Sequence, residues 1–564
     1  MLSPEKLIIK NLDVWTSSGK ASKNEGRGKS KKQELYGIKK LRELILEITI
    51  RGLLEPQVPS DEPASELLEQ IQAEKSNLVK NGKIRKTQIP SFRKNEEKPF
   101  ELPSGWEWAP LGIIGNIFNG NSISKQIKEE KYTNIAGYPF LATKDVGYGF
   151  EPLDYNNGIS IPIDEPKFKI AGKGSVLICA EGGSAGKKCG ITDRKICFGN
   201  KLFANELHCN IEPNFILSFY LTPTFYRQFR KLMKGIIGGI SASNFAQIQC
   251  PIPPLKEQKR IVAKVNELMS ICDRLESEQE NSHKSQETLV STFLNLLITS
   301  AENNLHFGEA WRTIQTNFDM LFTTESSIDQ LKQTILQLAV MGKLVPQNLA
   351  DQPASELLKI IAKERASLSK NDLLDNPISQ PSIKKKDEPY SCPKGWIFVR
   401  FGEVFTLKYG KSLPSTNRSE TGDFPVYGSN GVVGTHNESC IDKPCIIVGR
   451  KGSAGALNLC NDSGCWVTDV AYSVVPPSAL NLDYVFFCFQ SLGLDLLGKG
   501  IKPGLNRKEV YKLIVCIPPI AEQNRIVIKI NELMSMCDQL KSSLAAARTT
   551  QLNLADSLVK ETLR

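Results

Sequence analysis

An internal duplication constrains this chain more than any other feature. Residues 41–57 (LRELILEITIRGLLEPQ) align without a gap on residues 331–347 (LKQTILQLAVMGKLVPQ), at an offset of 290 positions. The match continues from DEPASELL (61–68) to DQPASELL (351–358), and roughly a third of positions between 41 and 106 are identical at this offset. Self-similarity of this kind indicates two structural copies within one chain.

A second duplicated block fixes where each copy ends. Residues 253–275 (PPLKEQKRIVAKVNELMSICDRL) match residues 518–540 (PPIAEQNRIVIKINELMSMCDQL) at an offset of 265. The offsets differ by 25, so the stretch between the two blocks is 25 residues longer in the first copy. The expected domains are an N-terminal constant region (1–105), a first module (106–252), a central constant region (253–395), a second module (396–517) and a C-terminal constant helix (518–564).

Both C-terminal constant blocks have the period of a long helix with a coiled-coil seam. The first seam is Ile261, Val265, Leu268, Cys272 and Leu275, and it is expected to resume at Leu289, Phe293 and Leu296. The second seam is Ile526, Ile530, Leu533, Cys537, Leu540 and Leu544, and it is expected to resume at Leu554 and Leu558. Pro253-Pro254 and Pro518-Pro519 set the helix starts, because proline suits only a first turn. About 45 residues would give a rod on the order of 65 Å long.

Two such helices would most simply pack against each other as an antiparallel coiled coil, with one module at each end. The alternative is that each helix folds back on its own module. The duplication favours the first arrangement, because tandem copies readily form a pseudo-two-fold dimer within one chain. The expected fold is therefore mixed α/β: two α/β modules separated by two long constant helices.

Glycine turns follow apolar runs in both modules. The stretches VLICAEGGSAGK (176–187) and IIVGRKGSAGAL (446–457) each run from a strand pattern into Gly-Ser-Ala-Gly. Lys234-Gly235 with Gly239 precedes the first long helix, as Lys499-Gly500 with Gly504 precedes the second. Such glycines permit positive φ and a close backbone approach to a ligand, although plain hairpin turns would leave the same pattern.

Catalytic patterns are missing from the sequence. It has no G-x-x-x-x-G-K-[ST] phosphate loop and no Asn/Asp-Pro-Pro-aromatic tetrapeptide of amino-methyltransferases. Its four histidines (208, 283, 306 and 436) have no HExxH, HxE or triad-like setting. Cys440, Cys445, Cys460 and Cys465 lack the tight pairs of structural zinc and are better interpreted as reduced strand cysteines. We therefore expect a binding protein with no metal and no catalysis of its own.

No secretory signal and no apolar run of about 18 residues is found, which favours a cytoplasmic protein without membrane contact. The formal charge is +10, but residues 1–40 hold ten basic against four acidic side chains, and residues 80–98 hold seven against two. The excess therefore belongs to an arm and a linker, which suit phosphates or a partner better than base reading. Charge alone is weak support for nucleic acid.

The duplicated blocks resemble the specificity subunits of type I restriction–modification systems, in the subgroup with an extended N-terminal conserved region. The resemblance covers nearly the whole chain and is most specific at PPLKEQKRIVAKVNELM (253–269) and its copy at 518–534. ELYGIKKLRELILE (34–47) carries the subgroup assignment.

The resemblance implies that each module is a target recognition domain that reads one half of a bipartite site in double-stranded DNA. The paired helices would fix the spacer between the halves. Two modification subunits would dock on the constant regions, and two restriction subunits would join them. S-adenosylmethionine, ATP and Mg²⁺ would belong to those partners, which methylate adenine N6 or cleave DNA. Alternatives are a stand-alone DNA-binding scaffold or decoy specificity protein, and a self-sufficient enzyme.

Candidate DNA contacts are the basic residues beside the glycine turns, because lysine and arginine neutralise phosphates. They are Lys187, Lys188, Lys201 and Lys234 in the first module, and Arg450, Lys451, Lys499, Lys502, Arg507 and Lys508 in the second. Some of these could be solvated surface charges. The candidate docking residues for the modification subunit are Glu257, Gln258 and Arg260, with their copies Glu522, Gln523 and Arg525. Alternatively, these six only cap the helix starts.

Overall fold

The computed structural model describes residues 4–17, 19–21, 33–82, 98–235, 238–303, 306–370, 381–462, 464–500 and 503–563. The chain forms two compact units. Unit one comprises Met1–Asn281 and Arg548–Arg564, and unit two comprises Ser282–Ala547. Unit one therefore contains the start of the first constant helix and the end of the second, and unit two contains the rest of both helices. No helix in the described parts of the chain is long and apolar enough to cross a membrane.

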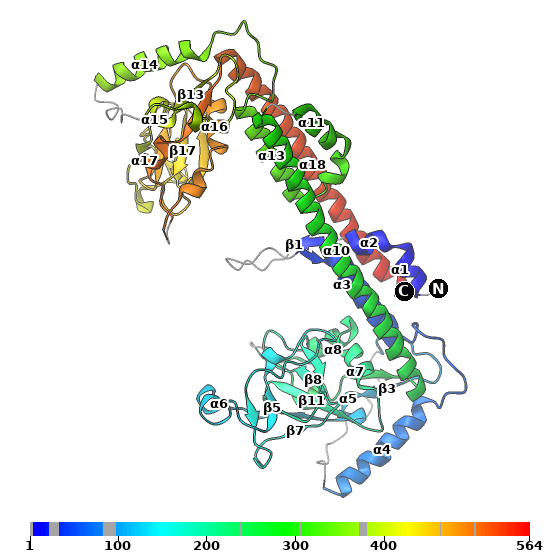
Figure 1. The fold of residues 1–564 in the computed structure, drawn as a ribbon. Helices are drawn as coiled ribbons and strands as arrows, with labels where there is room; N and C mark the ends of the chain where they lie inside the picture. Colours follow the sequence, from blue (N-terminus) through cyan, green and yellow to red (C-terminus); the bar gives the residue numbers. More distant parts are fainter. Residues whose placement is uncertain are drawn as a thin grey trace. The chain divides into compact units, whose positions relative to one another are not determined.

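Unit one starts with a constant region and continues into the first module (Figure 1). The constant region contains α1 (Pro4–Lys10), α2 (Leu12–Ser17), β1 (Gly19–Ala21), β2 (Gln33–Leu35), α3 (Tyr36–Ile50) and α4 (Ala64–Lys80). The helices of the module are α5 (Leu111–Ile114), α6 (Lys125–Lys131), α7 (Pro213–Tyr220), α8 (Pro223–Leu232) and α9 (Ala242–Phe245). The long helix α10 (Leu255–Asn303) begins directly after the module.

Three small sheets build the first module. An antiparallel sheet has the order β4-β11-β8-β9, with β4 (Gly115–Asn119), β11 (Leu202–Leu207), β8 (Val176–Cys179) and β9 (Cys189–Ile191). A mixed sheet has the order β6-β5-β10-β7, with β6 (Ser160–Ile161), β5 (Tyr138–Leu141), β10 (Ile196–Phe198) and β7 (Ile170–Ala171). The first and last strands, β3 (Glu107–Pro110) and β12 (Gln249–Ile252), pair antiparallel with each other.

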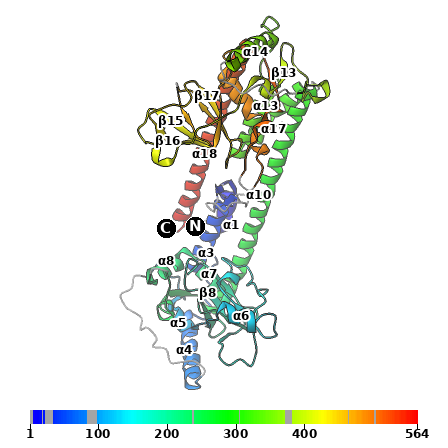
Figure 2. The ribbon, with the colours of Figure 1, turned by 90° about the vertical axis from the view of Figure 1, so that its left-hand side faces the viewer.

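Unit two repeats this plan. Its helices are α11 (Phe307–Thr316), α12 (Phe318–Leu321), α13 (Glu325–Val340), α14 (Ala354–Lys370), α15 (Phe401–Val404), α16 (Leu482–Gln490), α17 (Arg507–Tyr511) and the long α18 (Ile520–Thr562). Its strands are β13 (Ile397–Arg400), β14 (Lys408–Tyr409), β15 (Phe424–Gly428), β16 (Gly431–His436), β17 (Cys445–Gly449), β18 (Leu457–Cys460), β19 (Trp466–Val467), β20 (Ala471–Val474) and β21 (Ile514–Ile517). Figure 2 shows the strands of the second module from the side.

The two modules share one topology despite their different lengths. The order β14-β20-β17-β18 repeats β4-β11-β8-β9, and the parallel pair β15–β19 repeats β5–β10. The pair β13–β21 repeats β3–β12. Because equivalent strands of the two modules pair with equivalent neighbours, the divergent sequences adopt one common strand arrangement. This confirms the prediction of two mixed α/β modules.

Three separate apolar cores surround the constant helices. In unit one, the start of α10 and the end of α18 share a core with α3, through residues such as Leu268 and Ala555. In unit two, Cys537 of α18 shares a core with Val290 of α10 and with α11 and α13. The start of α18 also packs on the second module. In each of these two cores, an early part of one long helix thus lies beside a late part of the other, as in an antiparallel pair.

Polar contacts between constant helices follow the same plan in both units. In unit one, Arg42 of α3 pairs with Asp273 and Glu276 of α10, each at 2.8 Å. In unit two, Lys541 of α18 pairs with Asp329 of α13 at 2.9 Å. The helices α3 and α13 are therefore integral to the packing of the long helices, a role that the seam analysis did not assign to them.

The first half of each predicted seam is confirmed. In the resumed half, Phe293 and Leu558 pack on the cores as predicted, but at the other three positions the buried stripe is displaced by one residue. Ile261, Val265, Leu268 and Cys272 are buried. Farther along α10, Val290, Leu294 and Leu297 are buried, whereas Leu289 and Leu296 are exposed. In α18, Leu554 is exposed and Ala555 is buried. The distal part of α10 packs on α11 and α13 instead of α3, so these new neighbours determine which stripe is buried.

The displaced seam predicts a contrast between two leucines two positions apart on α10. Leu294 is 4% exposed and Leu296 is 52% exposed. Leu294→Ala should cost about 2–5 kcal/mol, because it empties a packed site. Leu296→Ala has the same helix propensity change and should cost about 0.5 kcal/mol or less. Calorimetry of the full chain should show a lowered melting transition for Leu294→Ala only; equal shifts would contradict the assigned stripe.

Candidate nucleic-acid interface

Each long helix begins at a buried polar joint with its own module. In unit one, Trp106 Nε1 donates to Glu257 Oε2 at 3.1 Å, and Gln57 Nε2 donates to Glu257 Oε1 at 3.4 Å. Gln258 donates to the carbonyl of Pro253 at 2.9 Å and accepts from the backbone N–H of Glu212 at 3.0 Å. The joint therefore fastens the first turn of α10 to the constant region and to the module.

Unit two contains the same joint. Trp396 Nε1 donates to Glu522 Oε2 at 2.9 Å, and Gln523 donates to the carbonyl of Pro518 at 2.9 Å. Gln523 also accepts from the backbone N–H of Asn481 at 2.9 Å. Glu522 Oε1 has no hydrogen-bond partner among the described residues. The joint is therefore a duplicated structural element.

These contacts correct the docking interpretation for four of its six residues. The glutamates and glutamines are at most 1% exposed, so they cannot present a polar surface to another subunit. The residues are Glu257, Gln258, Glu522 and Gln523. They also do more than cap a helix start, because they bind side chains and backbone of other elements. Helix-start sequence alone cannot distinguish an exposed acidic residue from a buried one.

Arg260 and Arg525 are partly exposed and lie at the edge of each joint. Arg260 Nη2 pairs with Asp61 at 2.7 Å, and Arg525 Nη2 pairs with Asp351 at 2.6 Å. Both aspartates are nearly buried, with side chains 6% and 8% exposed. Each pair ties the long helix to the loop before α4 or α14. Docking through these two arginines stays a prediction.

Burial also sets the protonation behaviour of the joint. It raises the pKa of the Glu257 carboxyl above its ordinary value, against the opposing effect of the bonds from Trp106 and Gln57. Burial likewise raises the pKa of Glu522, with Trp396 and Arg525 opposing it. Both carboxyls are therefore easier to protonate in the folded chain than in an exposed position.

The predicted basic residues of the first module do not form one cluster. Lys187 lies over the Tyr226 ring at 5.8 Å, and Lys188 donates to the carbonyl of Thr143 at 3.0 Å. Lys201 is exposed at the start of β11. Lys234 is exposed at an isolated β-bridge with Gly239. Of these four, only Lys234 lines the hollow described below.

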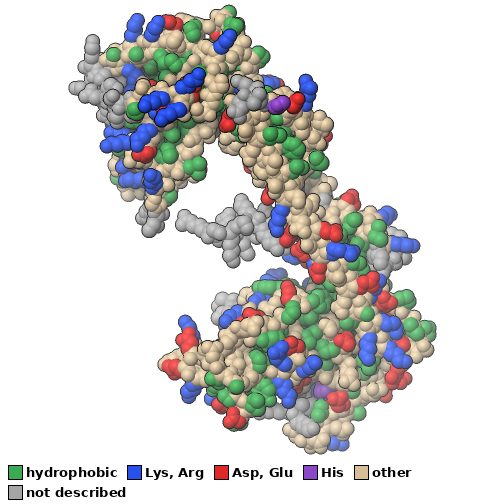
Figure 3. Space-filling model, in the orientation of Figure 1, with side chains coloured by type: hydrophobic (Ala, Val, Ile, Leu, Met, Phe, Trp, Pro, Cys, Tyr) green, Lys and Arg blue, Asp and Glu red, His purple; other side chains and the backbone are tan. Residues whose placement is uncertain are grey.

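The second module gathers its basic residues more closely, and Figure 3 shows Lys and Arg side chains over this module. The guanidinium groups of Arg450 and Arg507 lie over the Tyr409 ring at 4.6 and 4.9 Å from its centroid. Arg450 also lies 5.9 Å from the ring centroid of Tyr472. We call Tyr409, Arg450, Tyr472 and Arg507 the platform. Lys451, Lys499 and Lys508 are exposed, while Lys502 lies outside the described residues.

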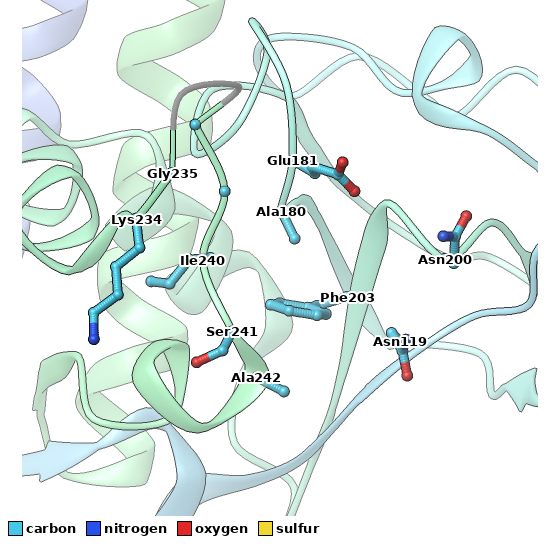
Figure 4. A pocket seen from close by; sticks show the side chains of 12 residues that line it. Asn119, Ala180, Glu181, Asn200, Phe203, Lys234, Gly235, Ile240, Ser241 and Ala242 are labelled. Atoms are coloured by element: carbon cyan, nitrogen blue, oxygen red, sulfur yellow. The ribbon is translucent and has the colours of Figure 1, made fainter.

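The first module contains a hollow of about 630 Å³ at the end of its antiparallel sheet (Figure 4). Its lining combines polar and apolar residues. The residues are Asn119, Ala180, Glu181, Asn200, Phe203, Lys234, Gly235, Gly238, Gly239, Ile240, Ser241 and Ala242. Among the described residues, the Glu181 carboxylate forms no ion pair and no hydrogen bond. The hollow therefore offers an unengaged acceptor.

Sequence reasoning missed most of this surface, because it searched for lysine and arginine only. Asn119 and Glu181 of the hollow are not basic, and Tyr409 of the platform is aromatic. The 290 offset between the constant regions extends to Asn119 and Tyr409, so applying it beyond residue 106 would have paired them. Their shared position was therefore available in the sequence, but their approach to Glu181 or Arg450 was not.

The turn glycines adopt the predicted backbone conformation. Gly186 and Gly455 close the two Gly-Ser-Ala-Gly turns with φ of +70° and +82°. Gly235 and Gly500 beside the lysines have φ of +83° and +97°. These positions favour glycine because a Cβ is strained there.

The four cysteines that were weighed as zinc ligands, Cys440, Cys445, Cys460 and Cys465, lie in or beside strands. Cys445 of β17 is opposite Cys460 of β18, and Cys465 Sγ lies 3.7 Å from Cys445 Sγ. Burial raises the pKa of Cys460 to about 11. Among the residues that the structure describes, no three metal-binding side chains are close enough to hold an ion.

Comparison with known proteins gives one consistent family. The family model described as the type I restriction modification DNA specificity domain matches residues 103–283 and again residues 393–547. The chain is 34% identical to the Escherichia coli EcoAI specificity subunit, over 99% of each chain. It is 32% identical to the Escherichia coli EcoEI specificity subunit, over 100% of each chain.

A solved structure concerned with complex assembly and conformational transition of the type I R-M system also aligns. Its TM-score is 0.50, with 16% identity, over 83% of this chain and 99% of the solved chain. At that identity, the match supports the fold alone. Two modules of the same topology on a repeated helical frame define a protein with two recognition units in one chain. This chain belongs to the family of type I restriction–modification specificity subunits.

The buried joint predicts a pH dependence of stability. Because the folded-state pKa of Glu257 and Glu522 is raised above the unfolded value, protonation favours folding, and their contribution improves as the pH falls. Glu257→Gln with Glu522→Gln keeps an oxygen acceptor for each tryptophan and removes this titration. From about pH 8 to about pH 5, the wild type should therefore gain unfolding free energy relative to the double variant.

Chemical denaturation of the full chain at several pH values measures this difference. Glu278→Gln with Glu287→Gln is a matched control, because both glutamates are exposed on α10. Parallel profiles of the wild type and the Glu257/Glu522 variant, or a relative loss by the wild type at low pH, would contradict the assignment.

Proposed function

We propose that this chain is the DNA sequence-specificity subunit of a type I restriction–modification complex. Each module reads one half of a bipartite site, and the constant helices fix the unread spacer between the halves. The observation that carries the proposal is the duplication itself: one frame holds two surfaces of different chemistry, a hollow with a free carboxylate and a platform of two arginines on tyrosines. A protein that recognises two unlike half-sites needs this arrangement.

The proposal assigns chemistry to partner subunits. Two modification subunits dock on the constant regions and supply adenine N6-methylation with S-adenosylmethionine, and two restriction subunits supply cleavage with ATP and Mg²⁺. The repeated pairs Arg260–Asp61 and Arg525–Asp351 support this count, because they give each unit the same partly exposed arginine beside its helix start. The chain itself contributes recognition and no catalysis. Because DNA is the ligand, we place this function in the cytoplasm.

The competing function is a stand-alone DNA-binding scaffold or decoy specificity protein without methylation. Mapping of N6-methyladenine by single-molecule sequencing separates the two, using a methylation-free host that expresses the chain with or without its modification subunit. We expect an asymmetric bipartite motif to be methylated only when both are present. Methylation by the chain alone, or of one continuous motif, would contradict the proposal, and DNA binding without methylation would favour the scaffold.

Phosphate contacts give a further prediction. Lys234 and Lys499 occupy the same position in the two modules, each bridged to a glycine, Gly239 or Gly504. A residue that is the same in both modules is suited to contact the phosphate backbone, because the backbone is the same in every DNA sequence. Lys234→Ala with Lys499→Ala should weaken binding evenly across sequences and lower the slope of log affinity against log salt by about 2.

Binding of the full chain to its site at several salt concentrations measures that slope. The control is Lys385→Ala with Lys386→Ala, which removes the same charge from exposed positions outside both modules. An unchanged slope in the Lys234/Lys499 variant, or an equal change in the control, would exclude these two lysines from the phosphate contacts.

A further inference from the structure

The hollow is built around a backbone junction at the end of β8. Isolated β-bridges join Glu181 to Gly239 and Lys234 to Gly239. The backbone N–H of Gly182 donates to the carbonyl of Gly238 at 2.9 Å, and that of Ile240 donates to Ala180 at 3.0 Å. The segment after β8 is thereby held against the segment before α9.

The second module forms the same junction at the end of β17. Isolated β-bridges join Lys451 to Gly504 and Lys499 to Gly504. The backbone N–H of Gly452 donates to Pro503 at 3.0 Å, and that of Leu505 donates to Arg450 at 2.9 Å. Ala180 and Glu181 of the first module therefore correspond, bond for bond, to Arg450 and Lys451 of the second.

The neighbouring strands extend the correspondence. In the first module, Phe203 of β11 lies opposite Ile178 of β8 and Asn119 of β4. In the second, Tyr472 of β20 lies opposite Val448 of β17 and Tyr409 of β14. Phe203 thus corresponds to Tyr472, and Asn119 corresponds to Tyr409.

A short helix completes each site. Ser241 caps α9 by accepting from Asn244 N–H at 3.2 Å, and Asn506 caps α17 by accepting from Lys508 N–H at 2.9 Å. The first residues of these helices are Ala242 and Arg507. The hollow and the platform are therefore one place on a common frame, filled by different side chains.

The difference in side chains explains the difference in shape. Asn119, Ala180 and Ala242 are small, so the first module has an open hollow. At the same positions, the second module has Tyr409, Arg450 and Arg507, whose stacked side chains fill the space. Arg450 is held further by a hydrogen bond from Nη1 to the carbonyl of Asp469 at 2.9 Å. Lys451 stays exposed beside this stack.

The two sites differ in charge at the residue that follows the strand, which is Glu181 in the first and Lys451 in the second, whereas Lys234 and Lys499 are common to both. The first site presents the Glu181 carboxylate with the carboxamides of Asn119 and Asn200 (Figure 4). The second presents the ammonium of Lys451 beside two guanidinium groups. A carboxylate on a DNA-facing surface is repelled by phosphates, so its favourable use there is to accept from a base amino group. Lysine donates to the paired acceptors O6 and N7 of guanine.

On the basis of the proposed DNA-recognition function, we propose that these equivalent places are base-reading sites of opposite hydrogen-bonding character. In the first module, Glu181 accepts from the exocyclic amino group of cytosine or adenine, with Asn119 and Asn200 beside it. In the second module, Lys451 donates to guanine, and the platform holds the surrounding surface in place. The side chain after β8 or β17 therefore determines part of each half-site.

Selection of DNA from a randomised pool by the full chain tests this inference. Glu181→Ala removes the acceptor oxygen, which a glutamine would keep, and should lower the preference for cytosine or adenine at one position of one half-site by about 5- to 150-fold. Lys451→Gln should lower the preference for guanine in the other half-site by a similar factor. The matched controls are Asp164→Ala and Lys443→Gln, which remove exposed charges of the same modules outside the two sites.

Failure of the inference is distinct from failure of the proposed function. If the wild-type chain selects no bipartite site, the proposed function fails. If it selects one, and Glu181→Ala or Lys451→Gln leaves the selected sequence unchanged, changes both halves or weakens all sequences evenly, the base-reading assignment of that residue is overturned. Should Glu181→Ala fail to fold by circular dichroism, Asn200→Ala at an exposed position replaces it, with the same expected half-site and the same overturning outcomes.

Discussion

A buried hydrogen bond between a tryptophan and a glutamate determines how each module is attached to its long helix. Trp106 belongs to the start of the first module, whereas Glu257 belongs to the first turn of α10, and Trp396 and Glu522 repeat the pair. An unpaired buried carboxylate would be costly, so the bond holds only when strand, helix and constant region meet in one arrangement. Recognition surfaces placed on the modules therefore inherit a fixed relation to the helix start.

The frame and its contents follow different physical rules. The junctions at Gly239 and Gly504 are made by backbone atoms, which every sequence supplies, and so they survive divergence of the side chains. The hollow and the platform differ through side chains alone, alanine or asparagine in one and arginine or tyrosine in the other. Groups that are the same in both modules can thus bind the DNA phosphates, while side chains that differ between the modules select the base pairs.

Sequence reasoning predicted the duplication, the starts of both long helices and the mixed α/β modules, because period and proline position are local signals. It failed where distant neighbours decide the outcome. Whether Leu289 or Val290 is buried depends on α11 and α13, and whether Glu257 is exposed depends on Trp106, which is distant in sequence. Glu181 escaped notice for a different reason: acidic residues were not sought on a surface expected to meet DNA.

The antiparallel pairs β3–β12 and β13–β21 have a consequence for how such a chain can change. In both modules the first and last strands pair with each other, so the chain leaves the constant helices and returns to them at the same place. The module is 25 residues longer in the first copy than in the second, but the pairing of its first and last strands is the same. An insertion or replacement within a module does not change the length of the constant helices. The half-site that a module reads can therefore change without changing the spacer between the two half-sites.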